Sequence, residues 1–333
     1  GFNSAWYFLG YYPHESAFAP DLTAFKHFEI TMEECNEIKQ GIDKLILNSD
    51  AENDGIGVYY SQSSMHAAKW YGVVSSYRNE LEAIARLLDA LGYRYDFVSA
   101  ASENGGSLNN YNIIIMPCAI SMSLKEIEGV GEFLDKGGAV IADVHPAIYD
   151  EHCLKYESGA FDVFYPRGDA GSVAQATRSA EMNYGEVEVL GTPFDKCSEN
   201  GVSLVNSEIC GVLAERLKEH GARKAVVVTD MHGNRIQDMH CYTFSFGSAM
   251  LCGIMYGDYS NRNLKETPVR VTFEKPYHIY DIRENTYHGY EDGISLKVVP
   301  QEAKLFGGLQ YRLGGLRVSA KQNHENGIIA IDC

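Results

Sequence analysis

The sequence YNIIIMPCAISMSLKEIEGVGEFLDKGGAVIAD, residues 111–143, predicts a strand, a helix and a second strand in order. The first apolar run, 113–115, is uninterrupted, as in a strand that is buried on both faces of a sheet. Ser123 and Glu126 fit a capping box at the start of the helix. Gly137 and Gly138 end that helix just before the apolar run 139–142. Two buried strands joined by a helix imply a parallel sheet.

The same alternation extends on both sides of this stretch. Residues 56–60 and 95–98 predict two more strands, and the apolar residues between them recur at helical spacing up to Gly92. Further along, we expect strands or helices in less regular sequence, at 161–165, 187–190, 202–205 and 207–220. We therefore predict an α/β domain over residues 51–221.

The flanking segments differ in character. Residues 1–50 are aromatic and irregular at first, and then predict a helix with Thr31 as its N-cap and Glu34 completing a capping box. From residue 222 apolar and polar residues alternate, as they do in strands, and turn residues recur about every 8–12 positions. This rhythm predicts an all-β sandwich domain over residues 222–333.

Composition excludes several classes of protein. The 333 residues carry 28 Lys and Arg against 45 Asp and Glu, a formal net charge of −17. Because a nucleic-acid surface needs clustered positive charge and no basic run occurs, we expect no nucleic-acid partner. No apolar run approaches the ~18–20 residues of a spanning helix, so we expect no membrane partner.

The eight cysteines form no C-x-x-C pair. Several lie in apolar runs, which predicts buried free thiols and favours a reducing compartment such as the cytoplasm without fixing it. Neither G-x-G-x-x-G nor a P-loop is present, so we expect no nucleotide cofactor, and no cofactor of another kind is indicated.

Several segments, taken in order, resemble one family. They are 41–48, GIDKLILN; 55–62, GIGVYYSQ; 111–117, YNIIIMP; 137–143, GGAVIAD; 280–283, YDIR; and 300–306, PQEAKLF. Together they resemble the glutamine-amidotransferase-like domain and following β-domain of family 42 β-galactosidases and related bacterial glycosidases. The resemblance implies a flavodoxin-like, class I glutamine-amidotransferase-like parallel sheet followed by a β-sandwich.

The resemblance also implies what would surround this chain. In that family the domain follows a catalytic TIM barrel and serves oligomerisation, so residues 1–50 would be a linker and helix at the tail of a missing barrel. The sandwich at 222–333 would be incomplete or followed by another module. A homo-oligomer, either a trimer or a dimer, is expected.

A catalytic reading of the α/β domain depends on three residues. Cys118 follows a central strand at the carboxyl edge of the sheet, where doubly wound sheets bind ligands. His145 and Asp143 follow the next strand, so a Cys118–His145 dyad assisted by Asp143 or Glu80 is one hypothesis. The alternative is a buried thiol beside an edge histidine. An amidotransferase nucleophile elbow is not present where the resemblance would place it, because residues 143–146 are Asp-Val-His-Pro.

Two His/Asp/Cys clusters and several aromatic residues were further candidates. The clusters lie at 143–153 and at 230–241, but their spacing fits no zinc motif, so we expect no metal site. Sugar contacts or oligomer contacts could involve the aromatic residues Trp6, Tyr59, Tyr60, Trp70, Tyr71 and Tyr77.

The functional prediction is therefore a non-catalytic accessory and oligomerisation region of a β-galactosidase-like glycosidase. A position at the border of a carbohydrate site is a further expectation. Two alternatives stay open: a hydrolase that uses Cys118 with His145, and a carbohydrate-binding module. On the first prediction the chain alone would be inactive and its parent protein would be a glycoside hydrolase.

Overall fold

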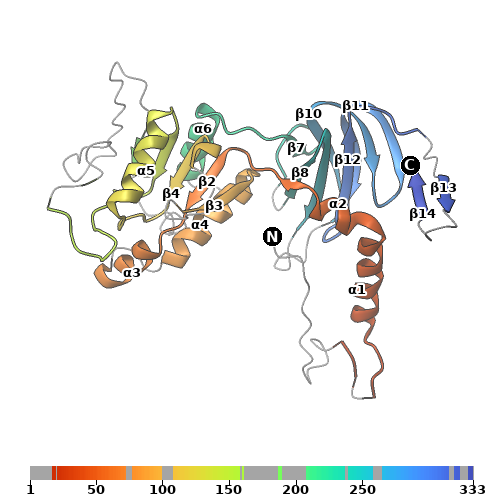
Figure 1. The fold of residues 1–333 in the computed structure, drawn as a ribbon, viewed down its shortest axis with the longest axis horizontal. Coiled ribbons are helices and arrows are strands. Elements are labelled where there is room, and N and C mark those ends of the chain that lie inside the picture. The colour runs from red at the N-terminus through yellow and green to blue at the C-terminus, as the bar shows by residue number, and fades with distance from the viewer. Residues whose placement is uncertain are drawn as a thin grey trace.

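The computed structural model describes residues 17–19, 21–72, 77–99, 108–157, 160, 187–189, 208–236, 239–257, 265–314, 319–322 and 329–332. A parallel sheet with its helices lies at one end of the molecule, and a larger antiparallel sheet lies at the other (Figure 1). Two of the predicted strands, at 161–165 and 202–205, lie outside the described residues. The structure confirms the predicted order of an α/β region followed by a β-rich region.

The parallel sheet has five strands in the order β3-β2-β4-β5-β6. All its neighbouring strands pair in parallel, with Ile56 beside Ile113 and Ile113 beside Ala139. The central strands are fully buried, as the uninterrupted apolar runs predict. The strands are β2 (Ile56–Tyr59), β3 (Tyr95–Val98), β4 (Ile113–Met116), β5 (Ala139–Ala142) and β6 (Val187–Val189).

Helices cover both faces of this sheet. Helix α5 (Leu124–Asp135) packs on the face that carries Ile114 and Val140. Helices α4 (Tyr77–Leu91) and α6 (Glu208–Glu219) pack on the opposite face, against Ile113 and Ile115. Successive strand residues point to opposite faces, which explains why the whole run 113–116 is apolar.

The helix boundary at Ser123 follows the sequence prediction. The Ser123 hydroxyl accepts a hydrogen bond from the Glu126 backbone N–H, and the Glu126 carboxylate accepts one from the Ser123 N–H at 2.7 Å. Glu126 also accepts a bond from the buried Tyr59 hydroxyl at 2.7 Å. The capping box therefore fixes the start of α5 and ties it to strand β2.

The β-rich region contains a seven-stranded antiparallel sheet in the order β1-β8-β9-β12-β10-β11, with β7 paired to β10. A separate hairpin pairs β13 with β14. The described residues thus show one large sheet and one two-stranded sheet, and a β-sandwich stays a prediction. The strands are β1 (Asp50–Ala51), β7 (Val226–Thr229), β8 (Met239–Phe246), β9 (Ala249–Tyr256), β10 (Thr267–Asp281), β11 (Thr286–Val298), β12 (Lys304–Leu309), β13 (Ser319–Gln322) and β14 (Ile329–Asp332).

The N-terminal helices lie beside the antiparallel sheet, and α1 projects from it (Figure 1). They are α1 (Lys26–Glu37), the π-helix η1 (Ile38–Ile42) and α2 (Asp43–Leu47). The predicted start at Thr31 is wrong: Thr31 lies inside α1 and donates its hydroxyl hydrogen bond to the His27 carbonyl at 2.9 Å. Strand β1 follows and pairs with β8, so this segment belongs structurally with the β-rich region.

One arginine connects α1 to the β-rich region. Arg283 donates to both carboxylate oxygens of Glu37 and to Glu34, each at 2.7 Å, and to the Ala303 carbonyl at 2.8 Å. Its side chain is 18% exposed. Asp281 is buried and accepts the backbone N–H bonds of Arg283 and Glu284, which shapes the turn after β10. The Tyr-Asp-x-Arg sequence therefore builds an attachment point for α1.

Cations also join the two sheets. The Lys224 ammonium, just before β7, donates to the Leu91 carbonyl at 2.6 Å and lies over the Tyr93 ring at 4.2 Å. In the opposite direction, the Arg94 guanidinium lies over the ring of Tyr242 on β8 at 4.1 Å. Such contacts combine apolar stems with charged ends, so the junction between the two regions is polar and specific.

Candidate functional site

The structure brings two of the three predicted catalytic residues together at the carboxyl edge of the parallel sheet. Cys118 follows β4 and Asp143 follows β5. The Cys118 backbone N–H donates to the Asp143 carboxylate at 2.7 Å, and the Val144 N–H donates to the same oxygen at 2.7 Å. The contact between Cys118 and Asp143 thus runs through the backbone of the cysteine.

Cys118 is fully buried, with 0% exposure. Its φ of 45° lies in the left-handed region that non-glycine residues rarely adopt. The Asp143 carboxylate accepts the N–H of this unusual turn, so it supports the conformation that places the Cys118 side chain inward. The thiol packs in an apolar cluster whose buried members are Ala67, Ala68, Tyr77, Cys118 and Ile120.

Helix α3 (Gln62–Tyr71) contributes Ala67 and Ala68 to this cluster, over the carboxyl edge of the sheet. The hydroxyls of Ser61, Ser63 and Ser64 all donate to the Ser121 carbonyl, at distances of 2.8–3.1 Å. The Ser121 N–H in turn donates to the Ser64 hydroxyl at 3.0 Å. This set of bonds holds the start of α3 against the loop after β4, and so keeps the cluster covered.

His145, the third predicted residue, is partly buried, and its Nδ1 lies 2.9 Å from the Pro146 carbonyl oxygen. Glu80, the proposed assisting acid, is fully buried on α4. Nearby, the Tyr77 hydroxyl accepts the Ser61 N–H at 2.8 Å. Burial raises the pKa of Tyr77, and the charges of Cys118 and Asp143 raise that pKa further. This edge is therefore a desolvated environment.

The two suspected metal clusters have a structural explanation. Asp150 accepts the backbone N–H groups of His152 and Leu154, at 2.9 and 2.8 Å. Asp230 does the same for His232 and Asn234, both at 2.8 Å. Each carboxylate thus organises a turn. In the part of the chain that the structure describes, no group of three His, Cys, Asp or Glu residues is placed to hold a metal ion; Asp238 lies outside it.

The aromatic candidates divide by exposure. Tyr59 and Tyr77 are buried and cannot contact a sugar from solvent. Trp70, by contrast, is 81% exposed on α3, next to Tyr71, whose ring stacks on that of Tyr149 with centroids 4.1 Å apart. Trp6 lies outside the described residues. Among these candidates, Trp70 and Tyr71 are thus exposed on α3, and Tyr60, which is 39% exposed, directly follows β2.

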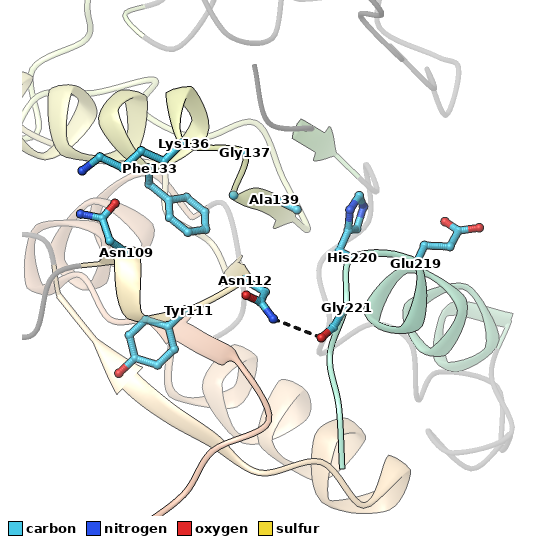
Figure 2. Close-up of a pocket in the computed structure, with 11 residues that line it drawn as sticks. Asn109, Tyr111, Asn112, Phe133, Lys136, Gly137, Ala139, Glu219, His220 and Gly221 are labelled. Carbon is cyan, nitrogen blue, oxygen red and sulfur yellow. Dashed lines mark hydrogen bonds between the residues drawn. The ribbon is translucent and has the colours of Figure 1, made fainter. Parts of the chain in front are cut away.

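Sequence reasoning missed an open cavity of about 560 Å³ at the opposite, amino edge of the sheet. The residues before β4 and β5 form its floor, and the C-terminal ends of α5 and α6 form its walls (Figure 2). The glycines that end both helices were visible in the sequence, but their meeting around one sheet edge was not. The lining residues are Asn109, Tyr111, Asn112, Phe133, Lys136, Gly137, Gly138, Ala139, Glu219, His220 and Gly221.

Two comparisons return no relatives: the sequence matches no family model and no curated protein. Solved structures with the same fold exist. A β-galactosidase from Bacillus circulans sp. alkalophilus superposes with a TM-score of 0.63 over 88% of this chain at 13% identity. A catalytic mutant of the GH42 β-galactosidase Gan42B from G. stearothermophilus superposes with a TM-score of 0.63 over 88% of this chain, also at 13% identity. An α-L-fucosidase isoenzyme from Paenibacillus thiaminolyticus superposes with a TM-score of 0.55 over 87% of this chain at 12% identity.

These similarities establish the fold, which is shared with a region of GH42 β-galactosidases. The chain covers 47%, 45% and 53% of the three neighbours, so it spans about half their length. Because the neighbours carry two different activities by name, the shared fold does not by itself decide an activity. None of the helices in the described part of the chain has the length and apolar character needed to cross a bilayer.

Proposed function

We propose that this chain is the non-catalytic accessory region of a GH42-like glycoside hydrolase, in which the α/β domain serves assembly into a homo-oligomer. The observation that carries this proposal is the complete burial of Cys118 and Asp143 at the edge where the fold would place a catalytic site. The match to GH42 β-galactosidases across both sheets supports the glycosidase context. The strand order β3-β2-β4-β5-β6 fits a flavodoxin-like, amidotransferase-like domain.

The burial argues against the hydrolase alternative on chemical grounds. A nucleophilic thiol must approach a substrate carbonyl and must be activated by a base within hydrogen-bond reach. Cys118 has no exposed surface, and the Asp143 oxygen nearest to it accepts backbone N–H bonds. We therefore assign this pair a structural role: it fixes the turn after β4.

The first prediction concerns the reactivity of the Cys118 thiol. In the native chain an aromatic disulfide reagent should modify Cys118 at least about 100-fold more slowly than Cys153 or Cys35, because only the thiolate of an accessible cysteine reacts. Both comparison thiols are free and only partly buried. Peptide mass spectrometry with time would measure the rates residue by residue. Modification of Cys118 as fast as Cys153 would support the hydrolase instead and would overturn this proposal.

The second prediction concerns assembly. Trp70 is 81% exposed, and tryptophan is enriched among the residues that dominate protein interfaces. If α3 contributes to an oligomer, Trp70→Ser should weaken association about tenfold or more, whereas Leu124→Ser, at the 61% exposed Leu124 on α5, should leave it unchanged. Analytical ultracentrifugation over a range of concentrations would give the association constants. A wild-type chain that stays monomeric at all concentrations would contradict the assembly role.

A further inference from the structure

We propose that the cavity at the amino edge of the parallel sheet binds a neutral polyhydroxyl ligand of the size of a mono- or disaccharide. Its volume of about 560 Å³ falls within the range of ligand pockets, roughly 300–1,000 Å³. The site is separate from the edge that carries Cys118, since Asn112 and Gly138 precede the same strands that Cys118 and Asp143 follow. The proposed glycosidase context serves only to choose the first sugar to test.

Backbone geometry keeps the cavity open. Gly137 has a φ of 87° and Gly221 a φ of 82°, which is the left-handed conformation that ends helices α5 and α6. A Cβ at Gly138 would lie 2.2 Å from the Phe133 ring, so a larger residue there would displace that ring. Glycines at these positions let both helices end abruptly, which leaves the space between their ends unfilled.

A hydrogen bond connects the floor of the cavity to the wall formed by the end of α6. The Asn112 side-chain amide donates to the Gly221 carbonyl at 3.1 Å, and so joins the start of β4 to the end of α6 (Figure 2). The Asn112 side chain also lies close to Gly55, where a Cβ would be 2.8 Å from its amide nitrogen. Asn112 therefore holds the floor in place, while the other polar groups of the lining can contact a ligand.

The charges of the lining favour a neutral ligand. Lys136 contributes one positive charge and Glu219 one negative charge, and Arg216 donates to that carboxylate at 2.7 Å. Both helices direct their C-terminal ends here, and the partial negative charge of a helix C-terminus disfavours phosphate and carboxylate groups. A phosphorylated or acidic ligand would lose part of its attraction to Lys136 through this effect, whereas a neutral ligand meets no such opposition.

The hydrogen-bonding groups suit hydroxyls. The side-chain amide of Asn109 can donate and accept, Lys136 donates, and Glu219 accepts. A sugar hydroxyl also donates and accepts, so it can satisfy groups of both kinds. Tyr111, in the floor before β4, donates its hydroxyl to Asp96 at 3.2 Å and is partly buried, which gives a fixed aromatic surface beside the polar groups. Pockets with an aromatic surface and a few fixed polar groups are typical small-molecule sites.

The test uses the full chain with galactose, galacturonate and galactosamine as probes of one size and three charges. We expect saturation-transfer NMR to detect galactose, and a titration to show it binding at least about fivefold more tightly than either charged sugar. Asn109→Ala should weaken galactose binding about fivefold to tenfold, since one or two hydrogen bonds are lost. Asn110→Ala is the matched control, because Asn110 is exposed in the same turn, η2 (Leu108–Asn110), and does not line the cavity.

A second pair of variants tests the charge argument. Glu219→Gln should change galactose affinity less than about threefold, like Glu215→Gln on the exposed side of the same helix. Four results would overturn the proposal. Two are the absence of saturation transfer to galactose and equal galactose affinities of the Asn109→Ala and Asn110→Ala variants. The others are tighter binding of galacturonate than of galactose, and a large loss of affinity in Glu219→Gln, which would indicate a site for a cationic ligand. If one of these results is obtained while Cys118 stays unreactive in the thiol-modification experiment described above, the cavity proposal fails alone and the accessory role stands.

Discussion

Arg283→Ala should release helix α1 from the β-rich region while both sheets stay folded. Arg283 makes three bonds of 2.7 Å to Glu34 and Glu37 and one of 2.8 Å to Ala303. No residue of α1 is buried, so among its described residues this cluster is the main polar attachment of the helix. The ion pairs also raise the pKa of Arg283 and lower that of Glu37, mainly through the hydrogen bonds between them.

The size of this effect follows from the exposure of the partners. Glu34 is 55% exposed and Glu37 35% exposed, so solvent screens the pairs and the sum of four charged bonds would overestimate their contribution. About 2 kcal/mol is a reasonable loss for a bidentate, partly buried arginine. That corresponds to about a thirtyfold increase in the open population of α1.

Hydrogen exchange would measure this opening. In Arg283→Ala the amides of α1 should exchange about thirtyfold faster, with little change in strands β4 and β10. Arg283→Lys keeps the charge but loses the planar, bidentate fork, so it should fall nearer to the alanine variant than to the wild type. Lys26→Ala is the surface control, because its pair with Glu29 is 77% and 52% exposed. Unchanged exchange in α1 would mean that apolar contacts hold the helix.

The N-terminus of α1 shows one limit of reading the sequence. Thr31 and Glu34 have the spacing of a capping box, and so do Ser123 and Glu126, yet only the second pair caps a helix. Ser123 is followed by an apolar face that packs on the sheet, whereas α1 has no buried face to set its start. Glu34 instead pairs with Arg283, which is 249 positions away in the sequence. A long-range ion pair of this kind leaves no local pattern.

The parallel sheet was predictable for the opposite reason. Both faces of β4 require apolar residues because helices pack on each of them, and the local run of isoleucines shows this requirement directly. The position of Cys118 and Asp143 after adjacent strands was predictable in the same way. The buried thiol was one of the two alternatives that the sequence left open, and the 0% exposure of Cys118 agrees with it. The way it is covered was not predictable, since the cover depends on hydroxyls of Ser61 and Ser64 that meet the Ser121 carbonyl across 57–60 positions.

The amino-edge cavity was unpredictable because of how it is assembled. Its lining extends from Asn109 to Gly221, and each part has an ordinary local role as a turn or a helix end. Only the topology brings the ends of α5 and α6, which cover opposite faces, to the same edge of the sheet. A binding site composed of helix ends therefore gives a weak signal in a single sequence.

Asp54→Asn should change how stability depends on pH, more than any other carboxyl substitution at the junction of the two regions. Asp54 is 7% exposed, and its carboxylate accepts the Arg94 backbone N–H at 2.7 Å. Burial raises its pKa from 3.8 to about 6, although the Arg94 bond and the charges of Lys224 and Arg94 act in the opposite direction. The neutral tyrosine Tyr93 lies in the same surroundings, and Asp54 contributes to raising its pKa.

The sign follows from proton linkage. Because the folded state holds the Asp54 proton more tightly than the unfolded state, this group contributes stability below about pH 4 that is lost as the pH rises through about 6. A shift of about two units corresponds to about 3 kcal/mol in all, of which about half lies between pH 5 and pH 8. Asparagine cannot ionise, so the variant should gain about 1–1.5 kcal/mol relative to the wild type over that interval.

Urea unfolding of both proteins at several pH values would measure the difference, which is more reliable than either absolute stability in a chain with two sheets. Asp50→Asn is the control for the loss of one carboxyl charge, because Asp50 is exposed on the neighbouring strand β1. A difference between Asp54→Asn and wild type that is constant with pH would show that Asp54 stays ionised in the folded protein. In that case Lys224 and Arg94 would outweigh burial, and the junction would be held by attraction between charges.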